Sequence, residues 1–350
     1  MKSITVSASK EYRVLIGNDL MSQIGTEVAS VIPGRKALVV SDSNVWPFYG
    51  ADVSRNLMEA GFEVSRFVFS AGESSKTAET YFQLLQTLSE NHLSRKDCII
   101  ALGGGVVGDL AGFAASTYQR GIGYIQVPTT VLAMVDSSVG GKTGIDLPAG
   151  KNLAGTFYQP NLVLCDIGTL HTLPDKEFRS GCAEIIKYAI LFDEALFHQL
   201  EENGTDFDKE EVIGCCIGWK KTVIEQDEYD TGCRQLLNLG HTIGHSIEKA
   251  SNYSVSHGFA VAAGMGIVCR SAAAFDLCSA EACNRIIGLL NQFLLPVTTD
   301  FSAAELARIA CSDKKCSGKH INMIIPATIG CCNRHLLPLE KLESFVKEGL

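Results

Sequence analysis

The stretch that decides the fold is Cys98-Ile99-Ile100-Ala101-Leu102 followed by Gly103-Gly104-Gly105-Val106-Val107-Gly108-Asp109. Five consecutive apolar residues predict a strand that is buried on both faces of a sheet. The glycine-rich turn after it allows backbone amides to approach a phosphate where a helix begins. The turn is not the full dinucleotide fingerprint, in which G-x-G-x-x-G is followed by an acidic residue about twenty positions on, so it indicates only a strand-to-helix turn that can bind an anion.

The residues around this stretch alternate between β-rich runs and amphipathic helices. Strands are predicted at 36–40, 63–69, 124–127 and 162–166, and a helix over 77–92. Such alternation predicts a parallel sheet covered by helices, with ligands at the carboxyl ends of the strands.

The pattern changes after Leu173-Pro174. Apolar residues recur at helical spacing over 176–200, 210–227, 241–250 and 261–274, and one strand is predicted at 321–326. We therefore predict an α/β plus all-α chain. A Rossmann-like parallel α/β domain spans residues 1–172, a mainly helical domain spans 173–350, and the active site lies in the cleft between them.

Composition and charge restrict the possible partners. The chain has 350 residues, of which 46% are hydrophobic and 20% charged, and this is typical of a globular protein with a large core. Its net charge of −9 makes nucleic acid an improbable partner. Since no apolar run reaches membrane-spanning length and the start lacks a signal-peptide core, we expect a cytoplasmic protein without membrane partners.

The 13 cysteines include no C-x-x-C pair, but there are two adjacent pairs, Cys215-Cys216 and Cys331-Cys332. An odd count without a secretion signal indicates reduced thiols that serve as small core residues.

Three separated residues could hold one divalent metal: Glu184, His241 and His257. One carboxylate and two imidazoles with an open fourth position are the ligands of a catalytic zinc. His241 and His245 lie on one face of a helix, so His245 is a further candidate ligand. Thr242 follows the first histidine where the zinc-protease signature requires Glu, so that class is excluded.

A second glycine-rich region spans residues 126–144 and contains Gly140-Gly141-Lys142-Thr143. This resembles the end of a P-loop, but Asp136 stands where that motif requires glycine. Lys142 here, and Lys151 with Asn152 shortly after, still predict an anion site.

Five motifs in this order closely resemble the 3-dehydroquinate synthase family of sugar phosphate cyclases: GGGVVGD, VPTTVLAMVDSSVGGKTGIDLPAGKNLAGTFYQP, CAEIIKYAI, RQLLNLGHTIGHSIE and SHG. The likeness runs from about Val39 to Lys315. It implies a homodimeric cytoplasmic lyase of the shikimate pathway, which makes precursors of aromatic amino acids, with NAD⁺ and zinc or cobalt as cofactors. The implied reaction converts 3-deoxy-D-arabino-heptulosonate 7-phosphate to 3-dehydroquinate and phosphate. It proceeds by transient oxidation, phosphate elimination, re-reduction, ring opening and aldol closure.

The resemblance also implies roles for individual residues. Glu184, His241 and His257 would bind the metal. NAD⁺ would contact Asp42, Ala71, Gly72, Glu73, Ser74, Ser75, Lys76, Gly105, Val106, Val107, Gly108, Asp109, Thr129, Thr130, Lys142, Lys151, Thr169, Leu170, His171 and Thr172. Substrate would contact Arg120, Lys142, Asn152, Lys220, Arg234, His245, Lys314 and Lys315. The catalytic residues would be Lys142, Lys187, Asp136, Asn238 and His245.

Two positions depart from the family pattern. Phe259 follows His257-Gly258 where the family commonly has Glu, which removes one carboxylate that could support His257. Asp230 replaces a common Glu four residues before Arg234. Two other readings stay open: a metal-dependent NAD(P) polyol dehydrogenase, and a sister cyclase that closes another sugar phosphate.

Overall fold

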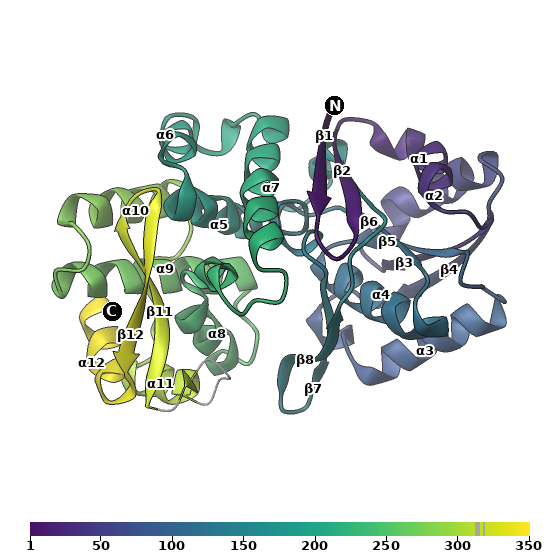
Figure 1. Ribbon diagram of the computed structural model, residues 1–350. Helices are drawn as coiled ribbons and strands as arrows, with labels where there is room; N and C mark the ends of the chain where they lie inside the picture. Colours follow the sequence, from purple (N-terminus) through teal and green to yellow (C-terminus); the bar gives the residue numbers. More distant parts are fainter. Residues whose placement is uncertain (312–315, 318) are drawn as a thin grey trace. The chain divides into compact units, whose positions relative to one another are not determined.

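The computed structural model describes residues 1–311, 316–317 and 319–350 (Figure 1). The chain divides into two compact units. The first contains Met1–Pro174 and Lys209–Tyr229, and the second contains Asp175–Asp208 and Asp230–Leu350. The predicted boundary after residue 172 lies near the end of the first segment. Segment 209–229 differs, because helix α7 (Lys209–Gln226) contacts strands β1 (Lys2–Ser7) and β2 (Glu11–Gly17) of the first unit.

The first unit is built on a seven-stranded sheet of order β1-β2-β9-β6-β5-β3-β4. All neighbouring pairs are parallel except β1 with β2. The remaining strands are β3 (Lys36–Asp42), β4 (Glu63–Phe69), β5 (Cys98–Gly103), β6 (Gly123–Pro128) and β9 (Leu162–Asp166). Each of the five strands predicted in this half of the chain is confirmed. The apolar runs of β3, β5, β6 and β9 are buried because helices cover both faces of a parallel sheet, whereas the edge strand β4 is mostly exposed or half-buried.

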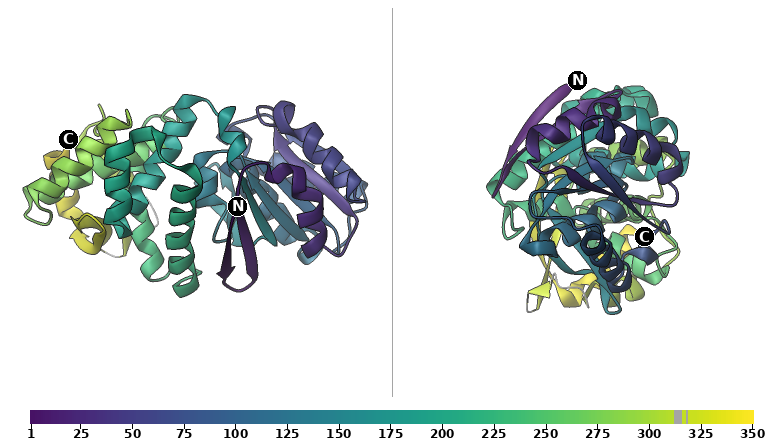
Figure 2. Two further views of the ribbon diagram at one scale, coloured as in Figure 1. Left: turned by 90° about the horizontal axis from the view of Figure 1, so that it is seen from above. Right: turned by 90° about the vertical axis from the view of Figure 1, so that its right-hand side faces the viewer.

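Helices cover the two faces of this sheet, as the views in Figure 2 show. Alternate strand residues face opposite sides: Val39 and Ile100 pack with helices α1 (Ile24–Val31) and α2 (Trp46–Glu59). Val40 and Ile99 pack instead with α3 (Ala78–Glu90) and α4 (Gly105–Thr117). The chain runs from β3 outward to β4 and then crosses back to β5 on the other side of β3. The point between β3 and β5 is therefore the topological switch point, where open α/β sheets bind ligands.

A hairpin of β7 (Lys142–Leu147) and β8 (Gly150–Phe157) also belongs to the first unit. Lys142 therefore begins a strand, whereas a P-loop lysine lies in a loop that leads into a helix, so the structure agrees with rejecting an NTPase. Short helical turns complete the unit: η1 (Leu20–Gln23), η2 (Glu73–Ser75), η3 (Tyr118–Arg120), η4 (Ala133–Ser137) and η5 (Ile167–His171).

The second unit is mainly helical, as predicted. Its helices are α5 (Asp175–Phe192), α6 (Glu194–Asn203), α8 (His241–Ala250), α9 (His257–Ala274), α10 (Ala280–Gln292), α11 (Ala303–Cys311) and α12 (Leu339–Gly349), with short turns η6 (Gly204–Asp206) and η7 (Cys233–Asn238). A sheet of β10 (Cys316–Ser317), β11 (His320–Thr328) and β12 (Cys331–Pro338) accompanies them. The predicted segment 176–200 is two helices, because Asp193 caps α6 by accepting a hydrogen bond from the amide of Leu196 at 2.9 Å.

Buried cysteines act as core residues in both units. Cys98 and Cys165 lie in strands β5 and β9 and are fully buried, and burial raises the pKa of both thiols above the usual value. Cys269 is likewise buried in helix α9. Such thiols pack as small hydrophobic groups, as the sequence predicts.

Candidate metal centre and nucleotide site

The predicted nucleotide residues follow the carboxyl ends of the parallel strands. Gly105–Asp109 form the first turns of α4 directly after β5, and Thr129 and Thr130 follow β6. The amide of Thr129 donates to the carbonyl of Gly103 at 3.0 Å, so the two loops lie side by side. A side chain at Gly104 would meet Thr130, since an added Cβ would lie 3.2 Å from its methyl carbon. This close approach favours glycine at position 104, beside the backbone amides at the start of α4 that can bind a phosphate.

The hydroxyl of Thr129 supplies an independent test of whether a ligand belongs here. Thr129 is 4% exposed, and its Oγ1 has no hydrogen-bond partner among the described residues. A buried hydroxyl without a partner is costly, so such atoms in native proteins usually serve a ligand or a water molecule. Its position beside the glycine turn is consistent with a nucleotide phosphate.

Lys76 joins several predicted nucleotide residues in one ion-pair cluster. Its Nζ lies 2.8 Å from Glu73, 3.2 Å from Asp109 and 3.8 Å from Asp146, and the side chain is almost fully buried. Burial alone would lower the pKa of Lys76, but the charges of Asp109 and Glu73 outweigh it and raise the pKa. Burial also raises the pKa of Asp109, to about 6, against the opposing effect of Lys76. Lys151 adds a second cation 3.9 Å from Glu73.

Other predicted nucleotide residues have structural partners of their own. Asp42 ends β3, and its Oδ1 accepts hydrogen bonds from the amides of Asn44 and Val45 at 2.8 and 3.0 Å. Residues 169–172 lie in and just after η5, where the hydroxyl of Tyr49 donates to the carbonyl of Thr169 at 3.1 Å. Residues 71–76 include η2. All of these loops follow β3, β4 or β9, at the carboxyl ends of the parallel strands.

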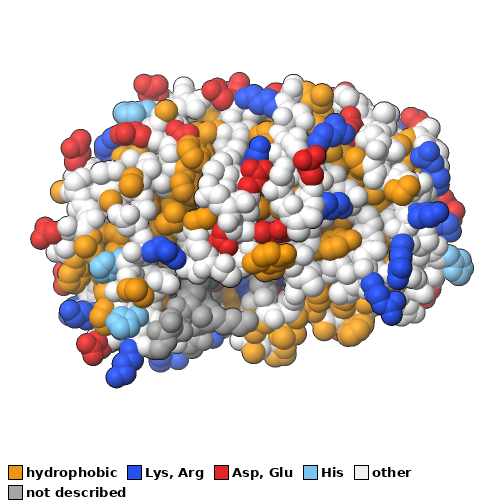
Figure 3. All heavy atoms as spheres, in the orientation of Figure 1, with side chains coloured by type: hydrophobic (Ala, Val, Ile, Leu, Met, Phe, Trp, Pro, Cys, Tyr) orange, Lys and Arg blue, Asp and Glu red, His pale blue; other side chains and the backbone are white. Residues whose placement is uncertain are grey.

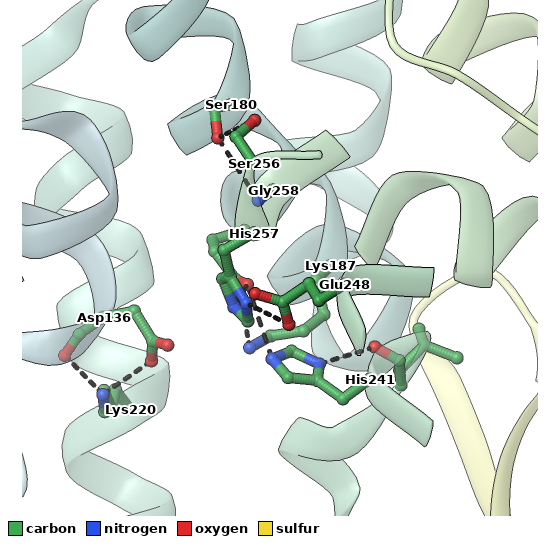
Figure 4. Close-up of polar contacts among 11 residues, drawn as sticks. Asp136, Ser180, Lys187, Lys220, His241, Glu248, Ser256, His257 and Gly258 are labelled. Atoms are coloured by element: carbon green, nitrogen blue, oxygen red, sulfur yellow. Dashed lines mark hydrogen bonds and ion pairs between the residues drawn. The ribbon is translucent and has the colours of Figure 1, made fainter. Parts of the chain in front are cut away.

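Four predicted substrate residues of the first unit lie in different environments. Lys220 of α7 is 5% exposed and donates to Asp136, both to its carbonyl and to Oδ1 at 2.6 Å. This pair is drawn in Figure 4. Asn152 has a positive φ of 53° and donates its amide to Asp146 at 2.8 Å. Arg120 and Lys142 are exposed.

The metal trio comes together within the second unit. Glu184 lies on α5, His241 begins α8 and His257 begins α9. Nε2 of His241 and Nε2 of His257 lie 3.5 and 3.4 Å from the same oxygen, Oε1 of Glu184. One ligand atom from each residue lies within 4.8 Å of the other two. Three convergent donors of this type suit a divalent zinc-class ion with one position left for substrate.

The outward-facing nitrogens of the two imidazoles are also engaged (Figure 4). Nδ1 of His241 lies 3.0 Å from the carbonyl oxygen of Leu239, and Nδ1 of His257 lies 3.3 Å from Oε2 of Glu248. Burial lowers the pKa of His241 well below its usual value. Burial also acts to lower the pKa of His257, but Glu184 and Glu248 outweigh it and raise the pKa to about 10. Both rings therefore direct Nε2 toward Glu184.

The other predicted residues of the second unit lie close to the metal trio in the sequence. Lys187 forms a direct ion pair with Glu184, one turn away on α5. His245 lies one turn after His241 on α8, with ring centroids 5.5 Å apart. Arg234 is 2% exposed and lies with Asn238 in η7, which contacts α5. The predicted phosphate contacts Lys314 and Lys315 lie outside the described residues.

Sequence reasoning missed two residues of these clusters, Glu248 and Asp146. Glu248 lies seven residues after His241, and the spacing 241, 245, 248 places all three on one face of a helix. That periodicity could have identified it. Asp146 reaches Lys76 through the β7–β8 hairpin, and no sequence period predicts such a contact.

Comparison with known proteins shows the family to which the chain belongs. Residues 66–180 match the model of the 3-dehydroquinate synthase N-terminal domain, and residues 181–316 match that of its C-terminal domain. The 3-dehydroquinate synthase of Enterococcus faecalis (strain ATCC 47077 / OG1RF) is 43% identical over 100% of this chain and 99% of its own length. This chain belongs to the 3-dehydroquinate synthase family.

Solved structures of enzymes with other names have the same fold. The 2-epi-5-epi-valiolone synthase from Streptomyces hygroscopicus subsp. jinggangensis 5008, solved with NAD⁺ and Zn²⁺ bound, is 27% identical over 97% of this chain and 98% of its own, with a TM-score of 0.88. A 2-deoxy-scyllo-inosose synthase, solved with carbaglucose-6-phosphate, NAD⁺ and Co²⁺, covers 100% of both chains at 24% identity and a TM-score of 0.90, which establishes the shared fold. Membership of the 3-dehydroquinate synthase family makes the chain a lyase and removes the polyol dehydrogenase reading.

Phe259 and Asp230 are the two positions that depart from the 3-dehydroquinate synthase pattern. The ring of Phe259 lies 5.9 Å from Nζ of Lys176, and the carboxylate beside His257 comes from Glu248 instead. Asp230 has a positive φ of 61°.

No helix among the described residues is long and apolar enough to cross a membrane. Charged side chains of both signs are interspersed on the face drawn in Figure 3.

Proposed function

We propose that this chain converts 3-deoxy-D-arabino-heptulosonate 7-phosphate to 3-dehydroquinate and inorganic phosphate. The convergence of Glu184, His241 and His257 is the observation that carries the proposal, in a chain that matches the family over its whole length. The substrate and the sum of the products have the same composition. Any hydride that is removed from the substrate must therefore return to it within one catalytic cycle.

The trio would hold a zinc-class ion through Oε1 of Glu184 and the Nε2 atoms of both histidines. When bound, this ion would supply a Lewis acid for the substrate oxygen that is oxidised and later reduced. Lys187 lies beside the same carboxylate and can hold or move a proton near that oxygen.

The loops at the carboxyl ends of the parallel strands in the first unit would hold the nucleotide. When bound, NAD⁺ would accept a hydride from the substrate and return it. The amides at the start of α4 and the hydroxyl of Thr129 would contact its phosphates. Asp42, beside the switch point, would accept the ribose hydroxyls and repel a 2′-phosphate, so we propose a preference for NAD⁺ over NADP⁺.

Cationic side chains would bind the two anionic ends of the substrate. Arg234 and Lys220 are assigned to its carboxylate, since the planar guanidinium of Arg234 can donate two parallel hydrogen bonds. Asp136, Asn238 and Lys187 are assigned to its hydroxyl groups. The phosphate is assigned to His245, Arg120 and one of Lys314 and Lys315, while Lys142, Lys151 and Asn152 are assigned to contacts around cofactor and substrate. The residues assigned to the cofactor and those assigned to the metal must act on one substrate.

A cyclase that acts on another sugar phosphate is the second candidate. Solved structures with the same fold include a 2-deoxy-scyllo-inosose synthase and a 2-epi-5-epi-valiolone synthase. The discriminating experiment compares turnover of the heptulosonate phosphate with turnover of a sugar phosphate that lacks the carboxylate. Preference for the carboxylate supports the synthase. Turnover of only the neutral-ended sugar would contradict it.

We also propose that the protein is a cytoplasmic homodimer. Family membership supports this, as does the pathway in which such enzymes act. Light scattering coupled to gel filtration should give a mass near twice the 37.7 kDa of one chain. A monomeric mass for the active protein would overturn the dimer.

A further inference from the structure

Glu248 is a buried carboxylate that the family assignment does not use. It lies near the end of helix α8 and is only 2% exposed. Its Oε2 lies 3.3 Å from Nδ1 of His257, which begins helix α9. Figure 4 shows the side chains of Glu248 and His257 meeting.

The contact decides which nitrogen of His257 can bind a metal. An imidazole that donates from Nδ1 leaves Nε2 as its lone-pair donor, and Nε2 is the atom 3.4 Å from Glu184. His241 achieves the same result with a backbone acceptor, the carbonyl of Leu239. His257 depends on a side chain, so its orientation can be changed by one substitution.

The backbone around His257 is already held firmly. The amide of Gly258 donates to Oγ of Ser180 at 3.2 Å, and an added Cβ on Gly258 would lie 1.8 Å from the carbonyl oxygen of Ser180. The helix start is thus packed tightly against α5. The ring itself retains a broad, nearly two-fold torsion about its terminal bond, which the backbone does not restrict. A partner for Nδ1 is what selects one ring orientation.

We propose that Glu248 is the positioning residue of the metal centre, which holds His257 with Nδ1 protonated and Nε2 directed at the ion. The inference rests on the metal site of the proposed function. It also explains how Phe259 is tolerated after His257-Gly258, because the supporting carboxylate comes from α8. A competing geometry exists, since His245, Glu248 and His257 form a second group of possible ligands within 4.8 Å. There Glu248 would bind the ion directly.

The test measures Zn²⁺ affinity of the full chain by competition with a chelator of known affinity. Loss of an outer carboxylate typically weakens metal binding about 10- to 100-fold, and we expect this for Glu248→Ala. Glu248→Gln keeps an acceptor oxygen but loses the charge, so a smaller loss of roughly two- to tenfold is expected. Lys249→Ala, an exposed neighbour on α8, should match the wild type.

A second measurement separates positioning from direct ligation. In the zinc-loaded wild type, ¹⁵N NMR should show His257 protonated on Nδ1 and metal-bound through Nε2, and Glu248→Gln should preserve that state. Metal bound through Nδ1 of His257 would overturn the proposal, as would wild-type affinity in Glu248→Ala. A wild type that binds no zinc would instead refute the metal site of the proposed function.

Discussion

The ammonium group of Lys187 contacts the carboxylate of Glu184 directly, one turn apart on helix α5. Glu184 is fully buried and Lys187 is 1% exposed. A buried charge is tolerated only when opposite charges and hydrogen bonds compensate it. Lys187 therefore compensates the carboxylate that the two imidazoles also face, and an ion bound by the trio would share this task.

Replacing Lys187 with Met should destabilise the metal-free protein. Removing one partner of a buried ion pair costs about 3–5 kcal/mol, because the other charge stays buried. Saturating Zn²⁺ should restore part of this loss, since the ion supplies positive charge to Glu184. Urea unfolding with EDTA and with Zn²⁺ measures both effects, and Lys341→Met, an exposed position on α12, is the control. Unchanged stability in EDTA would contradict the pairing.

His241→Ala should lose the bound metal and abolish turnover, because two remaining ligands hold a catalytic ion poorly. The wild type should contain one zinc-class ion per chain, lose activity with chelator and recover it with Zn²⁺ or Co²⁺. Metal analysis of purified protein checks the stoichiometry, with exposed His92→Ala as the matched variant. Full metal content in His241→Ala would refute the ligand set.

Arg234→Lys keeps the charge but loses the planar pair of donors. Losing one charge-assisted hydrogen bond costs on the order of 1.5–3 kcal/mol, or roughly ten- to a hundredfold in kcat/KM. Metal content and NAD⁺ affinity should stay near those of the wild type, and Arg308→Lys on α11 should change nothing. Wild-type efficiency in Arg234→Lys and Arg234→Ala would mean that the carboxylate binds elsewhere.

Asp109 should make the stability of the protein depend on pH. Its pKa is raised to about 6, so the folded protein binds this proton more tightly than the unfolded chain, whose aspartates have a pKa of about 3.9. The contribution is therefore present at low pH and is lost as the pH rises from about 4 through about 6. Asp109→Asn should remove this component from unfolding free energies measured between pH 4 and 7. Asp52→Asn, an exposed change, should retain it, and identical pH profiles for wild type and Asp109→Asn would refute the shift.

Local pattern predicted the elements well where burial was continuous. The run 98–102 and its neighbouring strands are buried on both faces, and helix α8 has the predicted bounds 241–250. The break at Asp193 was not predicted, because a cap within a long apolar period leaves the period intact. Segment 209–229 reads as one more amphipathic helix, and only tertiary packing shows that it belongs with β1 and β2.

The candidate site was predictable only as far as motifs reached. The metal trio could be named because Glu184 and His241 stand in long characteristic stretches and His257 stands in the short motif SHG that follows them. The contact of Glu248 with His257 joins helices α8 and α9, and the Lys76 cluster joins residues 73–76, helix α4 and strand β7. Helical spacing indicates the face of α8 on which Glu248 lies, but no local period predicts either contact. Such contacts depend on the packing of elements that are separated along the chain.

The most direct test of 3-dehydroquinate synthase activity measures phosphate, ring product and NADH together while the purified chain acts on the heptulosonate phosphate. We expect one phosphate for each 3-dehydroquinate formed, many turnovers for each NAD⁺, and no net NADH. Activity should stop with chelator and return with Zn²⁺. Accumulation of NADH in step with substrate loss, or product formed without phosphate release, would contradict the account.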